Sequence, residues 1–230
     1  MYHRHSRWLE ECIPPKQNAG FVSRMEDVLA VYQRPYNEAY PVVCMDEKPP
    51  QLPGDHRPGQ PMTKRHNRRE DSEYVRCGTR GIFMFNEPLG GKRYVSAREH
   101  RTKKDRAFEI KSLLTRQYPY AEKIVLVMDN LNTHTIASLY EAFRAEEALG
   151  MAQRLEVHFT PKHGSWLNMA EIELSALTSQ CLNRRIDTLA KLRKEIRAWQ
   201  QDRNRNKKTI KWQFTTADAR IQLHSLYPVI

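Results

Sequence analysis

Three carboxylates lie at positions typical of metal ligands. Asp46 and Asp129 directly follow the apolar runs 42–45 and 124–128, and Glu171 lies inside a later apolar segment. An apolar strand buried in a sheet delivers the residue after it to the sheet edge, where a carboxylate can bind a hard cation. If the three side chains converge in the fold, they form the metal site of an enzyme.

The first two carboxylates each leave an alternative open. Asp46 is followed by Glu47, and either can face the site because adjacent strand residues point to opposite sides. Asp129 precedes a polar turn in which Asn132 or Thr133 can cap the next helix, so a purely structural role for Asp129 is the competing interpretation.

Glu171 is more informative, because a carboxylate in an apolar helix needs a reason to be there. It borders a predicted buried stripe, whereas Glu173 is about 200° further around the helix and should face elsewhere. The alternative for Glu171 is an ion pair with a nearby Lys or Arg. The residues of the predicted stripe are Leu167, Ala170, Leu174, Leu177 and Cys181.

The charge of the chain favours a polyanionic partner. Lys and Arg number 38 against 27 Asp and Glu, which gives a net charge of +11. Residues 184–211 carry eleven of the basic residues and three acidic ones, and their apolar positions predict a helix with one basic face. Such a face can lie along a nucleic-acid backbone, and a solvated surface is the alternative interpretation. A weaker basic stretch covers residues 92–106.

Cysteine spacing and hydropathy predict a cytoplasmic location. The four cysteines include no C-x-x-C pair, which favours reduced thiols over a zinc ribbon or a disulfide framework. The N-terminus has no apolar signal region, and no apolar run approaches the roughly 20 residues needed to span a bilayer.

The elements that must position the carboxylates can be predicted from periodicity. Alternating or continuous apolar runs indicate strands, and apolar residues at i, i+4 and i+7 indicate helices. Residues 49–69, rich in Pro, Gly and Arg, predict a loop or a hairpin insertion, and 74–97 an antiparallel meander of three strands. The order of elements predicts an α/β fold, a mixed sheet flanked by helices. The expected helices are 17–33, 103–118, 135–148 and the one carrying Glu171, and the other strands are those ending at Asp46, 124–128 and 155–159.

Three oxygen donors suit one or two Mg²⁺ ions better than zinc. Two such ions can activate a water or hydroxyl and stabilise the leaving oxygen in phosphodiester displacement. On a basic protein, this chemistry predicts cleavage or transfer of nucleic-acid strands.

Residues 43–47, 127–134 and 160–173 closely resemble the catalytic core of DDE insertion-sequence transposases. The nearest group is the IS-six-thirty branch of the Tc/mariner superfamily. The resemblance continues through residues 212–220 and 226–228, so it covers most of residues 14–228.

This resemblance implies an RNase H-like fold with Asp46, Asp129 and Glu171 as the triad. It favours Asp46 over Glu47, and Glu171 is the glutamate of an Asn-x-x-Glu pattern that starts at Asn168. It also implies hydrolysis at transposon ends that depends on two Mg²⁺ ions, for which Mn²⁺ can substitute. The freed 3′ hydroxyl would then attack target DNA.

The resemblance also implies the partners of the protein. These are double-stranded DNA and a second copy of the chain, as a homodimer on DNA, with the protein associated with the nucleoid. Supporting roles are expected for Glu47, Asn130, His134 and Asn168.

Contacts with DNA phosphates are expected from two regions. By analogy with the family, Lys162 and His163 lie in the loop beside Glu171, where Trp166 either takes part or packs in the core. The basic C-terminal helix supplies the remaining candidates. These are Arg184, Arg185, Lys191, Lys194, Arg203, Arg205, Lys207 and Lys208.

The chain departs from the family pattern in two respects. The spacing from Asp129 to Glu171 is 171 − 129 = 42 positions, longer than is typical of the superfamily, and we expect the extra residues in the helix and loop at 141–154. The paired helix-turn-helix units of full-length relatives are not recognisable, so weak sequence-specific binding is expected.

The chain is predicted to divide into a linker and helix (1–40), the catalytic domain (41–183) and a basic extension (184–230). Two other functions stay open, a catalytically silent DNA-binding remnant and a generic Mg²⁺ nuclease.

Overall fold

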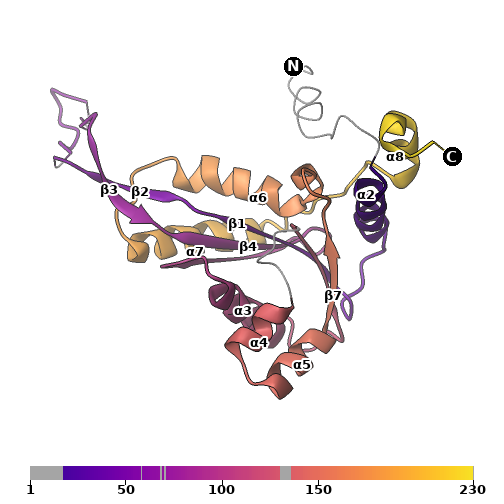
Figure 1. Ribbon diagram of the computed structural model, residues 1–230. Coiled ribbons are helices and arrows are strands. Elements are labelled where there is room, and N and C mark those ends of the chain that lie inside the picture. Colours follow the sequence, from indigo (N-terminus) through magenta and orange to yellow (C-terminus); the bar gives the residue numbers. More distant parts are fainter. Residues whose placement is uncertain (1–17, 58, 68, 70, 130–135, 230) are drawn as a thin grey trace.

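A mixed five-stranded sheet forms the centre of the fold (Figure 1). The computed structural model describes residues 18–57, 59–67, 69, 71–129 and 136–229. The strand order is β5-β4-β1-β6-β7, with β1, β6 and β7 parallel and β4 and β5 antiparallel to their neighbours. The strands are β1 (Val42–Lys48), β4 (Gly81–Glu87), β5 (Lys92–Arg98), β6 (Ile124–Met128) and β7 (Leu155–Phe159).

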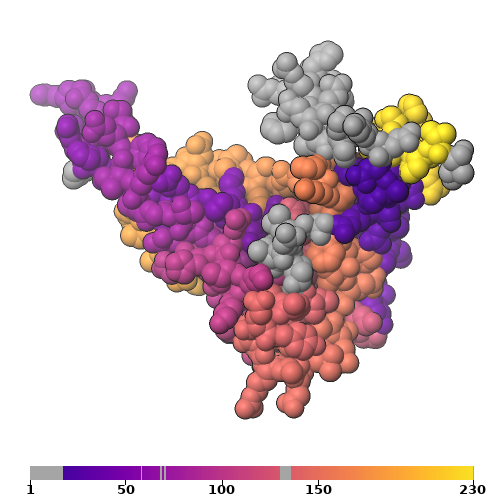
Figure 2. Space-filling view, in the orientation of Figure 1, coloured from indigo at the N-terminus to yellow at the C-terminus, as the bar shows by residue number. Residues whose placement is uncertain are grey.

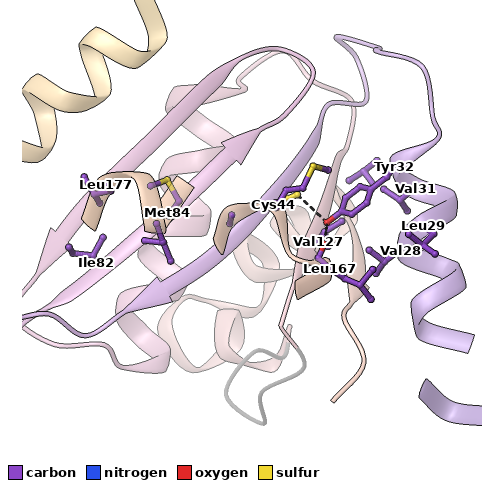
Figure 3. Close-up of a cluster of buried hydrophobic side chains, with 14 of the residues drawn as sticks. Val28, Leu29, Val31, Tyr32, Cys44, Ile82, Met84, Val127, Leu167 and Leu177 are labelled. Atoms are coloured by element: carbon purple, nitrogen blue, oxygen red, sulfur yellow. Dashed lines mark hydrogen bonds between the residues drawn. The ribbon is translucent and has the colours of Figure 1, made fainter. Parts of the chain in front are cut away.

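One face of the sheet is covered by helices from both ends of the chain. These are α2 (Ala19–Tyr32), α6 (Met169–Leu177), α7 (Leu189–Arg205) and α8 (Thr216–Gln222). Their apolar side chains pack with every second residue of the strands, including Cys44, Met84 and Val127 (Figure 3). Within α2, the residues that face this core are Phe21, Met25, Val28, Leu29 and Tyr32, and all five are buried.

The opposite face is covered by α3 (Lys103–Ser112), α4 (Ala137–Ala142) and α5 (Ala145–Gln153). One helix prediction was wrong in detail here. The helix expected over 135–148 is interrupted, because Phe143 and Arg144 are extended and α5 begins after them. Phe108 of α3 is 45% exposed and lies against the ring of Phe143.

The meander predicted for 74–97 was wrong in its pairing. β4 and β5 pair as expected, but β3 (Tyr74–Thr79) pairs with β2 (Gln51–Asp55) in a separate two-stranded sheet. The predicted insertion 49–69 therefore contributes the first strand of a hairpin whose second strand lies beyond it, in β3. Figures 1 and 2 show that β2 and β3 project away from the main sheet.

Side chains of α7 bind the free backbone groups of β5, which is an edge strand of the sheet. Asn204 binds both the amide and the carbonyl of Arg93, Gln200 accepts from the amide of Val95 at 2.8 Å, and Arg193 Nε donates to the carbonyl of Ala97 at 2.9 Å. Alternate residues of an edge strand point their polar backbone groups outward, so one helix face satisfies these positions in turn.

Among the helices that the structure describes, none combines the length and apolar character needed to cross a membrane.

Candidate active site

Asp46 and Asp129 lie side by side on neighbouring strands. Met45 and Met128 are register partners in the parallel pair of β1 and β6, and each aspartate is the next residue along its strand. On its other side β1 pairs with β4, where the register partner of Asp46 is Met84. Met84 belongs to the core beneath α6. Since cross-strand partners share a face, the Asp46 side chain points to the α6 side of the sheet.

Glu47 points to the opposite side. Its cross-strand partner is Phe83, which belongs to the core beneath α3, and its Oε2 lies 3.6 Å from Nε of Arg101. Its backbone amide donates to Asp46 Oδ1 at 2.7 Å. The alternation of the strand therefore separates the two carboxylates that the sequence left as alternatives.

Asn168 joins the aspartates to the helix that carries Glu171. Its Nδ2 donates to the carbonyl of Met45 at 2.9 Å and lies 3.3 Å from Asp129 Oδ1, while its Oδ1 caps α6 by accepting from the amide of Ala170. Asn168 is buried, so its amide has a fixed orientation. One side chain thus sets both the position of Asp129 and the start of α6.

Thr160 holds Asp129 from the other side. It directly follows β7, its amide donates to the carbonyl of Met128, and its hydroxyl donates to Asp129 Oδ1 at 3.1 Å. The sequence analysis missed this residue, although the end of a third parallel strand next to β6 was a signal that could have identified it.

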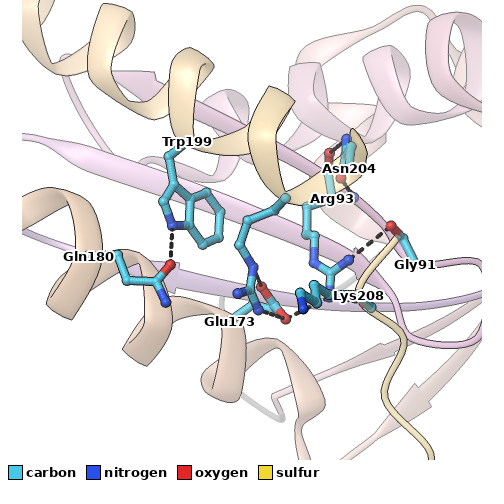
Figure 4. A network of polar contacts seen from close by, with 8 residues as sticks. Gly91, Arg93, Glu173, Gln180, Trp199, Asn204 and Lys208 are labelled. Atoms are coloured by element: carbon cyan, nitrogen blue, oxygen red, sulfur yellow. Dashed lines mark hydrogen bonds and ion pairs between the residues drawn. The ribbon is translucent and has the colours of Figure 1, made fainter. Parts of the chain in front are cut away.

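Glu171 lies in the first turn of α6 and is exposed. A carboxylate in this turn is favoured by the helix dipole. Partial desolvation and repulsion from Asp129 raise the pKa of Glu171, and a hydrogen bond from Ser165 opposes this rise. The ion pair considered as an alternative for Glu171 belongs instead to Glu173, which is buried between Arg93 and Arg203 (Figure 4).

Electrostatics links the three carboxylates. Burial, followed by repulsion from Asp129, raises the pKa of Asp46 to about 7, with a smaller contribution from Glu171. Since a nearby like charge disfavours ionisation, a divalent cation between these groups would restore their charged forms. The donor set consists of carboxylate oxygens, which fits Mg²⁺ or Mn²⁺.

A second acidic group lies on the projecting hairpin. Among the described residues, His56, Asp71 and Glu73 place one ligand atom each within 4.8 Å of one another, closer than the three carboxylates of the candidate site. Arg57 Nε also lies 3.6 Å from Asp71. One carboxylate of this group is therefore already paired with a guanidinium.

The predicted phosphate contacts differ in their surroundings. Lys162 and His163 are exposed, and Trp166 is half-buried in ring contact with Trp212 and Phe214. Lys194, Arg205, Lys207 and Lys208 are also exposed. The other four predicted residues are in ion pairs, namely Arg184 with Glu195, Arg185 with Asp55, Lys191 with Asp187 and Arg203 with Glu173.

Two predicted supporting residues, Asn130 and His134, lie outside the described residues. Tyr32 was not predicted to support the site. Its hydroxyl donates to the carbonyl of Leu167 at 2.6 Å and lies 3.5 Å from the sulfur of Cys44 (Figure 3). It therefore fixes α2 to both β1 and the loop before Asn168.

Solved structures with a similar fold are complexes of the Mos1 transposase. The Mos1 paired-end complex with left transposon end is 16% identical with a TM-score of 0.56, and the match covers 94% of this chain and 65% of that one. The Mos1 mariner paired end complex with Mn is 15% identical with a TM-score of 0.56, covering 89% and 64%. The Mos1 strand transfer complex is 15% identical with a TM-score of 0.53, covering 85% and 60%.

These likenesses show the fold. The α/β prediction is confirmed, with a mixed sheet of five strands flanked by helices as in an RNase H-like catalytic core. The chain spans less than two thirds of the length of these Mos1 chains. A comparison with curated proteins found no match.

The family is shown by a comparison with protein families. Residues 41–193 match the DDE superfamily endonucleases, and this segment includes all three carboxylates and every strand of the main sheet. The chain therefore belongs to the DDE superfamily endonucleases.

Proposed function

We propose that this chain is the catalytic domain of a DNA transposase of the IS-six-thirty branch of the Tc/mariner superfamily. It cleaves DNA strands at transposon ends and joins the freed 3′ ends to target DNA. The observation that carries the proposal is the placement of Asp46 and Asp129 at adjacent strand ends, facing the helix of Glu171.

In this proposal Asp46, Asp129 and Glu171 hold two Mg²⁺ ions. When bound, the ions would supply an activated water or hydroxyl and offset charge on the leaving oxygen. Asn168 and Thr160 keep Asp129 oriented, because both donate hydrogen bonds to the same carboxylate oxygen. Ligands that are held in position in this way lower the cost of assembling a metal site.

Double-stranded DNA is the proposed substrate, and a homodimer on DNA is the proposed assembly. The Mos1 structures include complexes with transposon ends, and others were solved with Mn or Mg. The net charge of +11 suits a polyanionic substrate. Exposed Lys162 and His163 follow Thr160, so they are placed to approach DNA phosphates near the carboxylates. Nucleoid association would follow from DNA binding.

The test is a nicking assay on duplex DNA that carries the ends of the element, with Mg²⁺ or Mn²⁺. Wild type should nick and then join 3′ ends to a target duplex, and Asp129→Asn should do neither. Equal nicking by Asp129→Asn would contradict the proposal. Nicking without joining would indicate a generic nuclease, and salt-sensitive DNA binding without nicking would indicate a catalytically silent remnant.

A further inference from the structure

A polar cavity of about 380 Å³ lies at the outer edge of the sheet, apart from the carboxylates. It is bounded by β5, by α3 with the π-helical turn Leu113–Gln117 that follows it, and by α7. Three arginines from two of these segments line it: Arg116, Arg193 and Arg197. None of them was singled out by the sequence analysis.

The charge of this cavity is strongly positive. Its acidic residue is Glu109, whose carboxylate is already paired with Nε of Arg98 at 2.5 Å. Arg116 and Arg197 are exposed, and within the described part of the chain neither side chain has a hydrogen bond or an ion pair. Two guanidinium groups are therefore available to an anionic ligand.

One further feature makes the cavity more than a collection of surface charges. Arg193 is held in place by the hydrogen bond from its Nε to the carbonyl of Ala97, so its guanidinium is anchored to the β5 edge. Arg197 lies one turn further along α7, so the anchored and the exposed guanidinium belong to neighbouring positions of one helix face.

The cavity lies on the same row of the sheet as the candidate active site. Asp46 pairs with Met84, and Met84 pairs with Val95 in the cavity lining. Two strand spacings separate the Cα atoms of Asp46 and Val95 by about 10 Å. Phosphates of one DNA strand advance about 3.4 Å per nucleotide along the duplex axis, so this separation corresponds to about three base pairs measured along that axis.

We propose that Arg116, Arg193 and Arg197 form a second binding site for the phosphate backbone of DNA, at the β5 edge. Guanidinium groups suit phosphate because their planar donors match its oxygens in pairs. The inference rests on the proposed function for the choice of DNA as the anion. It adds a subsite beyond the carboxylates and beyond the basic residues predicted from the sequence.

The test compares two double charge reversals by fluorescence anisotropy with a short labelled DNA duplex, between about 50 and 200 mM salt. Arg116→Glu with Arg197→Glu should weaken binding at least about tenfold and make the log–log salt slope shallower by about 2. The matched control is Lys123→Glu with Arg144→Glu, which makes the same change of net charge at two exposed residues away from the cavity. The logarithm of the dissociation constant should change less than half as much in the control variant as in the cavity variant. An equal loss of affinity in the two variants, or no loss in the cavity variant, would overturn the proposal.

Location is tested by modifying arginines with phenylglyoxal, read out by mass spectrometry. The duplex should protect Arg116 and Arg197 in wild type and equally in Asp129→Asn, whereas inorganic phosphate at the same phosphate concentration should not. Protection by inorganic phosphate but not by the duplex would overturn the assignment to DNA, as would DNA binding without protection. Protection without any nicking would refute the proposed activity and leave the subsite standing.

Discussion

At the scale of single residues, two glutamates on α6 have opposite environments. Glu171 is exposed beside Asp129, and its pKa is raised by desolvation and repulsion. Glu173 is 1% exposed, and although burial favours its neutral form, hydrogen bonds and ion pairs with Arg93 and Arg203 lower its pKa overall. The helix repeat of 3.6 residues separates two positions that look equivalent in the sequence.

We therefore expect Glu171→Gln and Glu173→Gln to fail in different ways. Glu171→Gln should change the free energy of unfolding by less than about 0.5 kcal/mol, because it removes an exposed charge that is repelled by Asp129. Its nicking rate should fall more than about 100-fold, since a residue that merely supports a metal site already accounts for about 10–100-fold. Chemical denaturation and the nicking assay measure the two effects.

Glu173→Gln should instead lose stability, by about 3–5 kcal/mol, because it leaves the buried guanidinium of Arg93 without a counter-charge. Comparable stability of the two variants would show that the network in Figure 4 contributes little to folding.

At the scale of elements, the sequence predicted the strands better than their pairing. Apolar runs identify β1 and β6 because these two strands lie inside the sheet and their apolar residues are largely buried, and that pattern is local. The partner of β3 is not local, because a long insertion separates it from β2. The seal of β5 by α7 was also unpredictable, since it depends on Gln200 and Asn204 meeting backbone groups more than a hundred residues away.

The hydrogen bond between Gln200 of α7 and the amide of Val95 in β5 can be tested by substitution, with the neighbouring residue Gln201 as the control. Gln200→Ala should lower the free energy of unfolding by about 1–3 kcal/mol, because the amide of Val95 loses its partner at the sheet edge. Hydrogen exchange at that amide should become faster. Gln201→Ala changes an exposed residue and should alter stability by less than about 0.5 kcal/mol. If the exchange rate at Val95 were the same in both variants, the helix would not be protecting this edge.

The attachment of α2 to the candidate site can be tested at Tyr32. Tyr32→Phe removes the donor to the Leu167 carbonyl, which should lower the free energy of unfolding by about 1–2 kcal/mol. Nicking should fall as well, because the loop before Asn168 loses a contact that holds it. Tyr36→Phe, at a residue that is 50% exposed, is the control and should leave both unchanged. An unchanged nicking rate in Tyr32→Phe would show that the contact between α2 and Leu167 is not needed for DNA cleavage.

At the scale of the whole molecule, α2 is joined to the C-terminal segment by Glu26. This carboxylate accepts two hydrogen bonds from Arg220 at 2.8 and 3.0 Å and one from Tyr227 at 2.9 Å. The contact joins residues 194 positions apart, and no pattern in the sequence predicts it. Because α2 also contacts the candidate site through Tyr32, the C-terminal segment stabilises the helix that holds Leu167, the residue before Asn168.

The contact also predicts a dependence of stability on pH. Hydrogen bonding to Arg220 is the main cause that lowers the pKa of Glu26 below 4.5. A carboxylate whose pKa is lowered by folding stabilises the protein above its unfolded pKa and loses that contribution as the pH falls through the folded value. Wild type should therefore exceed Glu26→Gln in thermal stability at pH 7, by up to about 1 kcal/mol because Arg220 is mostly exposed. The difference should shrink as the pH falls below about 4.5 and then through the lower folded pKa, because the wild-type carboxylate becomes protonated over this range. A difference that stays constant from pH 7 to pH 3 would mean that packing or the Tyr227 bond, and not the charge of Glu26, joins the two ends.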